Sequence, residues 1–430
     1  MPRDTNPFET EVLADDVIEA WPNISLPPAP RPETRRFLII AGPFGAFTRR
    51  LGEALREAGA PCERVLLNAG DAYDWGTRHV QPYFGPFSGW SAWLFETVRR
   101  HGVTDLILYG DAHPYCKEAV KVAARIRLRV HVLEQGYFRP FWVTLERGGV
   151  NGNSALPRDP LFYRAAGRWA PEPAEIWLPP LTPPAARRIT AYHAALILGA
   201  PAFPRFHAPY AYPILRQALG HTRRYLGQKL FRGRHQRRLA AALDTSGPLF
   251  LGILQRPGDS QLRIHSDLAS TADFVELVVS SFARKSPAEA RLLFKSHPLD
   301  HGLEPHARTI AEAAKRFEVT GRVFFADTGD LEKIFPKAAG AVTVNSTAGL
   351  SAIEKGLPTL TLGTAIYDMA GLTHQRGLDT FWTAPQKPDP SLYQAFRRVV
   401  IERTQVSGAY ASNRGVEFAA PEVSRRLLAA

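Results

Sequence analysis

The fold of this chain is decided by the stretch from Phe250 to Asp300. It begins Phe250-Leu-Gly-Ile-Leu-Gln-Arg-Pro-Gly-Asp259 and ends Leu-Leu-Phe-Lys-Ser-His297-Pro-Leu-Asp300. Each end is an apolar run that passes directly into polar, turn-forming residues, as buried parallel strands do at their carboxyl ends. Residues 271–284 between them carry apolar side chains at helical spacing. The pattern predicts strand, helix and parallel strand, so that Asp259 and His297 emerge on one edge of one sheet and face the same ligand.

The same alternation recurs on both sides of this unit. Strand patterns occur at residues 36–42, 64–68, 105–109, 130–134, 341–345 and 358–363, and helical patterns near residues 48–58, 88–101 and 113–127. This order predicts an α/β fold with two Rossmann-like domains that face a central cleft. Neither a GxGxxG nor a Walker pattern is present, so no dinucleotide or P-loop site is indicated.

The pattern divides the chain into five parts. We expect a flexible Pro-rich arm (1–35), an N-terminal Rossmann-like domain on the acceptor side (36–200), a basic helical linker (201–246), a C-terminal Rossmann-like domain that binds the nucleotide sugar (247–390) and a C-terminal helical tail (391–430). A helix from about residue 390 to 400 is expected to cross back to the first domain.

Polar residues follow several predicted strands of the N-terminal domain. Asp71, Asp111 and Glu134 each lie just after an apolar run. Residues 137–154 are rich in aromatic, glycine and polar residues and lack a helical period, which indicates an extended excursion that lines the cleft. We therefore expect the acceptor side of the cleft to be formed by Asp71, Asp111, Tyr137, Arg139 and Asn151.

Composition limits the class of protein. The chain has 430 residues, of which 45% are hydrophobic, and no apolar run reaches eighteen residues. Its N-terminus lacks the basic and then apolar pattern of a secretory signal, so we expect a cytoplasmic location. Cys62 and Cys116 are too few for a disulfide framework and are expected to be reduced.

The net charge of +12 is unevenly distributed. Residues 176–243 contain no acidic residue and carry eleven Lys and Arg residues, all between positions 187 and 238. Such a segment suits nucleic acid, an anionic membrane surface or an acidic substrate, or is a solvated helix face. Leucines at helical spacing among the arginines favour a membrane-facing helix, or pair of helices, over nucleic-acid binding.

The predicted strand ends offer groups for phosphate chemistry. Ser346 and Thr347 open a predicted helix whose free N–H groups, hydroxyls and positive dipole end suit a phosphate, although a plain helix cap has the same sequence. Lys295 and His297 are expected to serve the same phosphate, and Asp259 and Glu134, one from each domain, are the candidate carboxylates for glycosyl transfer. Metal-ligand spacing is absent, so neither a metal ion nor a cofactor is required.

Several of these motifs together resemble the bacterial capsule polysaccharide biosynthesis family. The similarity rests on five segments in the same order, namely Glu134–Ser154, Asp259–Gln261, Lys295–Asp300, Val344–Ser351 and Gly363–Thr373. The resemblance as a whole covers roughly residues 36 to 400. Members of this family are β-Kdo glycosyltransferases that build the Kdo linker of the capsule on a phospholipid at the inner membrane.

The resemblance implies a GT-B-like fold and transfer of Kdo from CMP-Kdo with retention of configuration. It implies that Glu134 is the acid/base, although Gln135 replaces the second acidic residue of that motif, and that Asp259 is the nucleophile of a double displacement. A front-face mechanism is the alternative. The implied contacts to the nucleotide and its phosphate are Lys295, His297, Pro298, Asn345, Ser346, Thr347 and Gly349. The implied partners are CMP-Kdo, a lipid acceptor such as phosphatidylglycerol, the anionic inner-membrane surface through residues 187–238, and other capsule assembly proteins.

Three other readings remain open at the level of sequence. A nucleotide-sugar epimerase has the same architecture but needs no lipid acceptor. A non-catalytic protein of the export machinery would use the basic segment to hold lipid-linked polysaccharide. Nucleic-acid binding is permitted by charge, but no recognised module is present.

Overall fold

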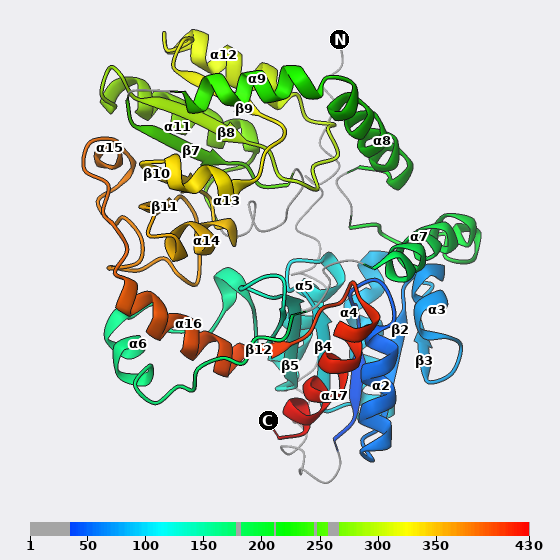
Figure 1. Ribbon diagram of the computed structural model, residues 1–430. Coiled ribbons are helices and arrows are strands. Elements are labelled where there is room, and N and C mark those ends of the chain that lie inside the picture. Colours follow the sequence, from blue (N-terminus) through cyan, green and yellow to red (C-terminus); the bar gives the residue numbers. More distant parts are fainter. Residues whose placement is uncertain (1–34, 178–181, 210–211, 245–246, 257–265, 430) are drawn as a thin grey trace.

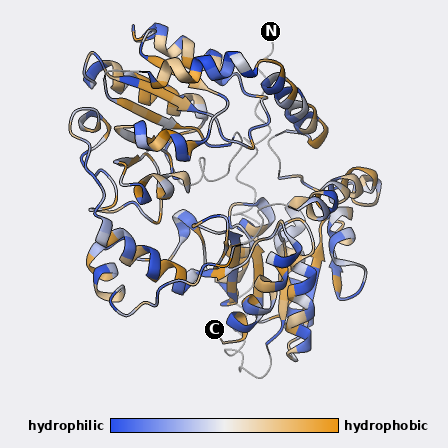
Figure 2. Cartoon of the chain, viewed as in Figure 1, coloured by the Kyte–Doolittle hydropathy of each residue, from blue (hydrophilic) through white to orange (hydrophobic). Residues whose placement is uncertain are grey.

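The computed structural model describes residues 35–177, 182–209, 212–244, 247–256 and 266–429. Two sheets form two lobes, one in the first part of the chain and one in the second (Figure 1). The apolar residues concentrate in the strands of both sheets (Figure 2). The predicted mixed α/β class with parallel sheets is therefore confirmed. Asp259 and nearly all of the predicted arm lie outside the described residues.

The N-terminal sheet has seven strands in the order β12-β6-β5-β4-β1-β2-β3. Five of them are parallel and follow the Rossmann order 3-2-1-4-5, because β1 pairs with both β2 and β4. Helices α4 and α5 pack on one face of the sheet, and α2 packs on the other. The bounds are β1 (Phe37–Ile39), α2 (Phe47–Glu57), β2 (Cys62–Leu66), α3 (Ala69–Trp75), β3 (Val80–Pro82), α4 (Trp90–His101), β4 (Asp105–Tyr109), α5 (Pro114–Ile126) and β5 (Arg129–Gln135).

The C-terminal sheet has five strands in the order β11-β10-β7-β8-β9, all parallel, which is again 3-2-1-4-5. The strand, helix and strand predicted for residues 250–300 are β7, α11 and β8. Helices α11 and α12 cover one face, and α9, α13 and α14 cover the other. The bounds are β7 (Leu249–Ile253), α11 (Thr271–Lys285), β8 (Arg291–Lys295), α12 (His306–Arg316), β9 (Val323–Ala326), α13 (Leu331–Ile334), β10 (Gly340–Thr343), α14 (Ala348–Glu354) and β11 (Thr359–Thr361).

The end of the chain returns to the first lobe, as the sequence predicted. Helix α16 (Pro390–Thr404) leads into β12 (Gln405–Ser407), which pairs antiparallel with β6 (Trp142–Arg147). Helix α17 (Asn413–Ala429) then packs against α2. Two expectations were wrong in detail: the segment after β5 contains the sheet strand β6 rather than only an extended excursion, and the tail contains a strand as well as helices.

A shared apolar cluster joins the two lobes around α16. It combines Tyr163, in α6 (Pro160–Ala166), and Phe396, in α16, with Tyr367 and Leu372 from the loop that follows β11. These side chains are at most 1% exposed. The contact between the lobes around α16 is therefore apolar, and it holds α16 in place where the chain returns from the second lobe to the first.

The basic segment forms the three helices α7 (Pro183–Leu198), α8 (Ile214–Leu230) and α9 (Arg232–Leu243). Helix α7 lies beside α3, where Arg188 pairs with the buried carboxylate of Asp74. Helix α8 directs Arg224 at Asp327 of the C-terminal domain. Two of the eleven basic residues are thus held in ion pairs inside the protein. None of the described helices is both long and apolar enough to cross a membrane.

Candidate functional site

The candidate site lies where the strand order of the C-terminal sheet reverses, between β7 and β10. Ligands of open parallel sheets bind at such switch points, outside the carboxyl ends of the strands. Gln255, which follows β7, donates a hydrogen bond from Nε2 to Oδ1 of Asn345, which follows β10, at 2.8 Å. This bond spans the switch point. Asn345 therefore lies beside the loop that follows β7, and its predicted contact with the nucleotide phosphate stays a prediction.

Lys295 is the last residue of the neighbouring strand β8 and is 3% exposed. Its Nζ donates to the backbone oxygen of Ser296 at 2.6 Å. Burial lowers the pKa of Lys295 to about 8, while the charge of Asp327 opposes this shift. The amine therefore remains mostly protonated at neutral pH.

His297 follows β8 by two residues and is held as a neutral imidazole. Burial, together with the positive charges of Arg139 and Arg256, lowers the pKa of His297 to about 4. Its Nδ1 accepts a hydrogen bond from the backbone N–H of Leu299 at 3.0 Å. Because Nδ1 is an acceptor, the proton of the neutral ring is on Nε2, which becomes a hydrogen-bond donor.

The structure brings Arg139 of the N-terminal domain into electrostatic range of His297. Arg139 precedes a cis proline, Pro140, in the loop after β5, and Arg256 follows β7. Both side chains are exposed, so their charges are free to meet a ligand. Positive charge from both domains thus converges on the buried Lys295 and the neutral His297. This arrangement suits a phosphate or diphosphate group.

Arg224 of α8 fixes the loop that carries His297, a role that the sequence did not reveal. It donates to the backbone oxygens of His297, Pro298 and Asp300 at 3.2, 3.0 and 2.6 Å. It also pairs with Asp327 at 2.8 Å. Helical spacing alone does not tell which of several arginines faces inward, so the sequence offered no signal that singles out this residue.

Ser346 and Thr347 precede the helix that they were expected to open. Helix α14 begins at Ala348 and has seven residues, with Thr347 as its N-cap, and Oγ of Ser346 accepts a hydrogen bond from the N–H of Ala348 at 3.2 Å. Gly349 is required for packing, because a Cβ atom there would lie 2.3 Å from Oη of Tyr367. The Tyr367 hydroxyl donates to the backbone oxygen of Ser346 at 2.5 Å, which orders this turn.

Glu134 lies near the end of β5, half-buried, and its Oε1 accepts a hydrogen bond from the N–H of Gln135 at 2.8 Å. The hydroxyl of Tyr410, a residue that follows β12, donates to the backbone oxygen of Glu134 at 3.2 Å. The negative charge of Glu134 contributes to the raised pKa of Tyr109, whose main cause is burial. Glu134 is therefore at the predicted edge of the N-terminal sheet.

Two of the predicted acceptor-side carboxylates are structural. Asp71 is 5% exposed and forms an ion pair with the buried guanidinium of Arg64 at 2.7 Å. Asp111 accepts hydrogen bonds from the N–H of Val150 at 3.1 Å and from Nδ2 of Asn153 at 3.0 Å. Both side chains are committed to the interior, so the prediction that they line the acceptor side of the cleft is not supported by their positions.

Tyr137 and Asn151 belong to a buried network around Glu146, which the sequence reading did not select. The Tyr137 hydroxyl donates to Oε1 of Glu146 at 2.5 Å and accepts from the N–H of Asn151 at 2.8 Å. Burial raises the pKa of Glu146 to about 6, although hydrogen bonds from Ser154 and Tyr137 oppose the shift. No alternation of polar and apolar residues marks Glu146 in the sequence, because Val143, on the other face of β6, is also buried.

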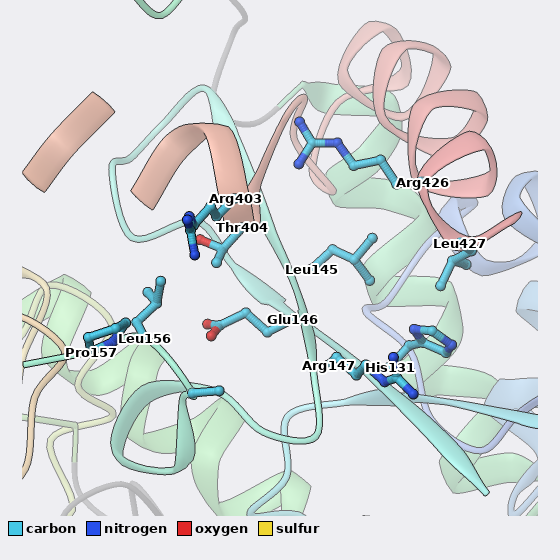
Figure 3. A pocket seen from close by; sticks show the side chains of 11 residues that line it. His131, Leu145, Glu146, Arg147, Leu156, Pro157, Arg403, Thr404, Arg426 and Leu427 are labelled. Atoms are coloured by element: carbon cyan, nitrogen blue, oxygen red, sulfur yellow. The ribbon is translucent and has the colours of Figure 1, made fainter. Parts of the chain in front are cut away.

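Glu146 also borders a cavity of about 300 Å³ (Figure 3). The cavity lies at the C-terminal end of β6, away from Glu134 and the loop after β5. Arg147, the last residue of β6, lies opposite His131, near the start of β5, in the antiparallel register. Arg403 of α16 and Arg426 of α17 line it as well. Among the residues that the structure describes, no group of three or more His, Cys, Asp or Glu side chains is arranged to hold a metal ion.

Two Rossmann-type sheets with a cationic strand-end site define a GT-B-like α/β protein. The chain belongs to the capsule polysaccharide biosynthesis protein family, whose model matches residues 104–410. The family resemblance deduced from the sequence motifs is therefore confirmed.

Individual relatives cover nearly the whole chain. The capsule polysaccharide export protein KpsS of Escherichia coli is 32% identical over 382 residues, which are 87% of this chain and 97% of that protein. The capsule polysaccharide modification protein LipB of Neisseria meningitidis serogroup A is 31% identical over 387 residues, 87% of this chain and 91% of that protein. Among solved structures, KpsC of Thermosulfurimonas dismutans, a β-Kdo 2,7-transferase, is 12% identical with a TM-score of 0.42, covering 92% of this chain and 99% of that one.

Proposed function

We propose that the protein is a glycosyltransferase that moves Kdo from CMP-Kdo to a phosphatidylglycerol-type lipid or to a Kdo-primed acceptor, at the anionic face of the inner membrane. The observation that carries the proposal is the convergence of buried Lys295, neutral His297 and Arg139 at the carboxyl end of β8, beside the switch point. This cationic site suits the phosphate of a nucleotide-linked sugar. Membership of a capsule biosynthesis family supports a capsule sugar as the group transferred.

In the proposed reaction, the bond between the anomeric carbon of Kdo and the phosphate oxygen breaks, and CMP leaves with the electron pair. Nε2–H of His297 and the Lys295 ammonium stabilise the charge that develops on the leaving phosphate. Asp259 attacks first to form a covalent intermediate, which the acceptor hydroxyl then displaces with retention. Glu134 removes the proton of that hydroxyl.

The test is CMP release from CMP-Kdo by the purified chain, with and without a fluorescent phosphatidylglycerol analogue. We expect acceptor-dependent release and a mass gain of one Kdo on the lipid. His297→Ala should lower kcat by about 100-fold, as the loss of one charge-stabilising donor does. His101→Ala, at the end of α4, removes an imidazole far from the site and should leave kcat unchanged. Asp259→Asn should abolish transfer if Asp259 is the nucleophile.

A second candidate function is favoured by the printed name of one relative. KpsS is called an export protein, so a non-catalytic role in holding lipid-linked polysaccharide is the alternative. Intact CMP-Kdo after incubation of the folded protein with both substrates would refute the transferase and favour this alternative. Binding of CMP-Kdo that survives His297→Ala unchanged would refute the assignment of the site.

A further inference from the structure

Helix α8 exposes a row of leucines to solvent. Gly220 and Arg224 face the C-terminal domain, where a Cβ atom on Gly220 would lie 2.3 Å from the backbone oxygen of His301. The opposite side of the helix carries leucines at spacings of four, seven and four residues, which places them on one face. Their exposed fractions are 67% for Leu215, 70% for Leu219, 51% for Leu226 and 77% for Leu230, and Phe231 follows at 57%.

Such a row is unusual on a solvated helix. Scattered exposed leucines need no explanation, but four on one helix face form a continuous apolar surface, which marks an interaction site. Helix α8 stands at the side of the C-terminal lobe (Figure 1). Arg216 and Arg223 border the row, and no acidic residue occurs between positions 176 and 243. All charged side chains of α8 around the leucines are therefore positive.

A cavity of about 620 Å³ lies beside this row, between α8, α9 and the segment that contains α13. Tyr225 and Lys229 line it from α8, and each is followed by a leucine of the row, about 100° further around the helix. Leu239 and the buried Ile334 also line the cavity. An apolar row beside a cavity lined mostly by polar residues suits an amphiphile, whose apolar and polar parts meet different surfaces.

The rim of the cavity is cationic. Lys229, Arg232, Lys333 and Lys337 line it, and none of the four forms an ion pair with a residue that the structure describes. The single carboxylate among the lining residues is Asp330, whose Oδ1 accepts a hydrogen bond from the N–H of Glu332 at 3.1 Å. The four cations therefore exceed the acidic groups of the cavity by three, and their charge is available to an external anion.

We infer that the α8–α9 elbow is a docking site for an anionic phospholipid bilayer, in which the leucine row enters the interface and the cationic cavity receives a lipid phosphate headgroup. The inference rests on the membrane association in the proposed function and gives it a location. The cavity lies on the donor domain and involves none of the predicted donor or acceptor residues. The lipid bound there is thus an anchor rather than a substrate.

The test is flotation of the full chain with phosphatidylcholine vesicles that contain or lack phosphatidylglycerol. Wild type should float only with phosphatidylglycerol. Lys333→Gln combined with Lys337→Gln should weaken binding about 30-fold, from roughly 1 kcal/mol for each basic residue at an anionic surface. Leu219→Ser combined with Leu226→Ser should weaken it at least about 10-fold, because two inserted leucines are lost.

The matched control is Arg234→Gln combined with Arg238→Gln. It removes the same charge from α9, but neither residue lines the cavity, so we expect a loss below about 3-fold. An equal loss of vesicle binding in the lysine double variant and in the arginine double variant would show that the membrane attracts the net charge of the protein, and it would overturn the headgroup site. Concentration-dependent dimerisation in the absence of vesicles, abolished by Leu219→Ser with Leu226→Ser, would assign the row to a second copy and also overturn the proposal. Transfer to a soluble acceptor, measured in parallel, reports separately on the proposed function.

Discussion

Replacing Arg224 with alanine should destabilise the C-terminal domain by about 3 kcal/mol. The guanidinium is 10% exposed and its partner Asp327 is 20% exposed. Removal leaves this largely buried carboxylate with a hydrogen bond from Gln228 and the charge of Lys295 but without its ion-pair partner, a loss that costs about 3–5 kcal/mol for a fully buried pair. The residual exposure of Asp327 places the expected value at the lower end. The backbone oxygens of His297, Pro298 and Asp300 lose a donor at the same time.

The measurement is thermal unfolding followed by circular dichroism, where about 3 kcal/mol corresponds to a fall in Tm of about 6–12 °C for a domain of this size. Arg223→Ala is the matched control, because Arg223 is adjacent and exposed and makes one hydrogen bond, of 3.3 Å, to Gly302; it should change stability by less than about 0.5 kcal/mol. Arg224→Lys keeps the charge but not the planar fork and should be intermediate. A Tm for Arg224→Ala within about 2 °C of wild type would refute the reasoning.

Three further predictions concern buried groups. The pKa of Glu146 in the folded state is about 6, above its ordinary 4.5. The protonated carboxyl therefore stabilises the fold below pH 4.5, and this contribution is lost as pH rises through 6. In denaturant titrations, the free energy of unfolding of wild type should fall by about 2 kcal/mol from pH 4.5 to neutral pH, relative to that of Glu146→Gln. Gly349→Ala should cost about 1–3 kcal/mol through contact with Tyr367, and a double-mutant cycle with Tyr367→Phe should show that the two losses are not additive. Asp71→Ala should cost about 3–5 kcal/mol by isolating Arg64, measured as a loss of Tm.

Each of these has an outcome that would contradict it. A pH-independent difference between wild type and Glu146→Gln would mean that the carboxyl is ionised without penalty. Additive losses in the Gly349 cycle would mean that the alanine methyl group meets something other than the tyrosine hydroxyl. Unchanged stability of Asp71→Ala, with impaired acceptor binding, would restore Asp71 to the acceptor site.

The sequence predicted the parallel strands well because each is a short apolar run that ends in polar residues. Strand β4 matches its predicted range of 105–109, and β5, predicted at 130–134, is Arg129–Gln135. Strand β12 was missed because its pairing with β6 joins segments more than 250 residues apart in the chain. No local pattern specifies such a partner, and a three-residue strand has too few positions to show alternation. Strand β6 pairs with the nearby β5, but its segment was interpreted as an extended excursion.

The positions of some site residues were also predictable from the sequence. Lys295 and His297 lie at the carboxyl end of β8, as the apolar run before them indicated, while their role in binding phosphate stays a prediction. Asp71 was misplaced because a polar residue after a strand can equally turn inward to a buried partner, here Arg64. Arg224 was missed because the face that a basic helix turns to its domain depends on tertiary packing.

The pairing of β12 with β6 also bears on how the chain is made. Strand β6 is synthesised more than 250 residues before its outer neighbour, so during translation it is the uncovered edge of an otherwise formed sheet. Exposed edges recruit strands from other chains. The nascent N-terminal domain is therefore open to mispairing until residue 407 has left the ribosome, and its sheet gains its last strand only after the whole C-terminal sheet has been synthesised.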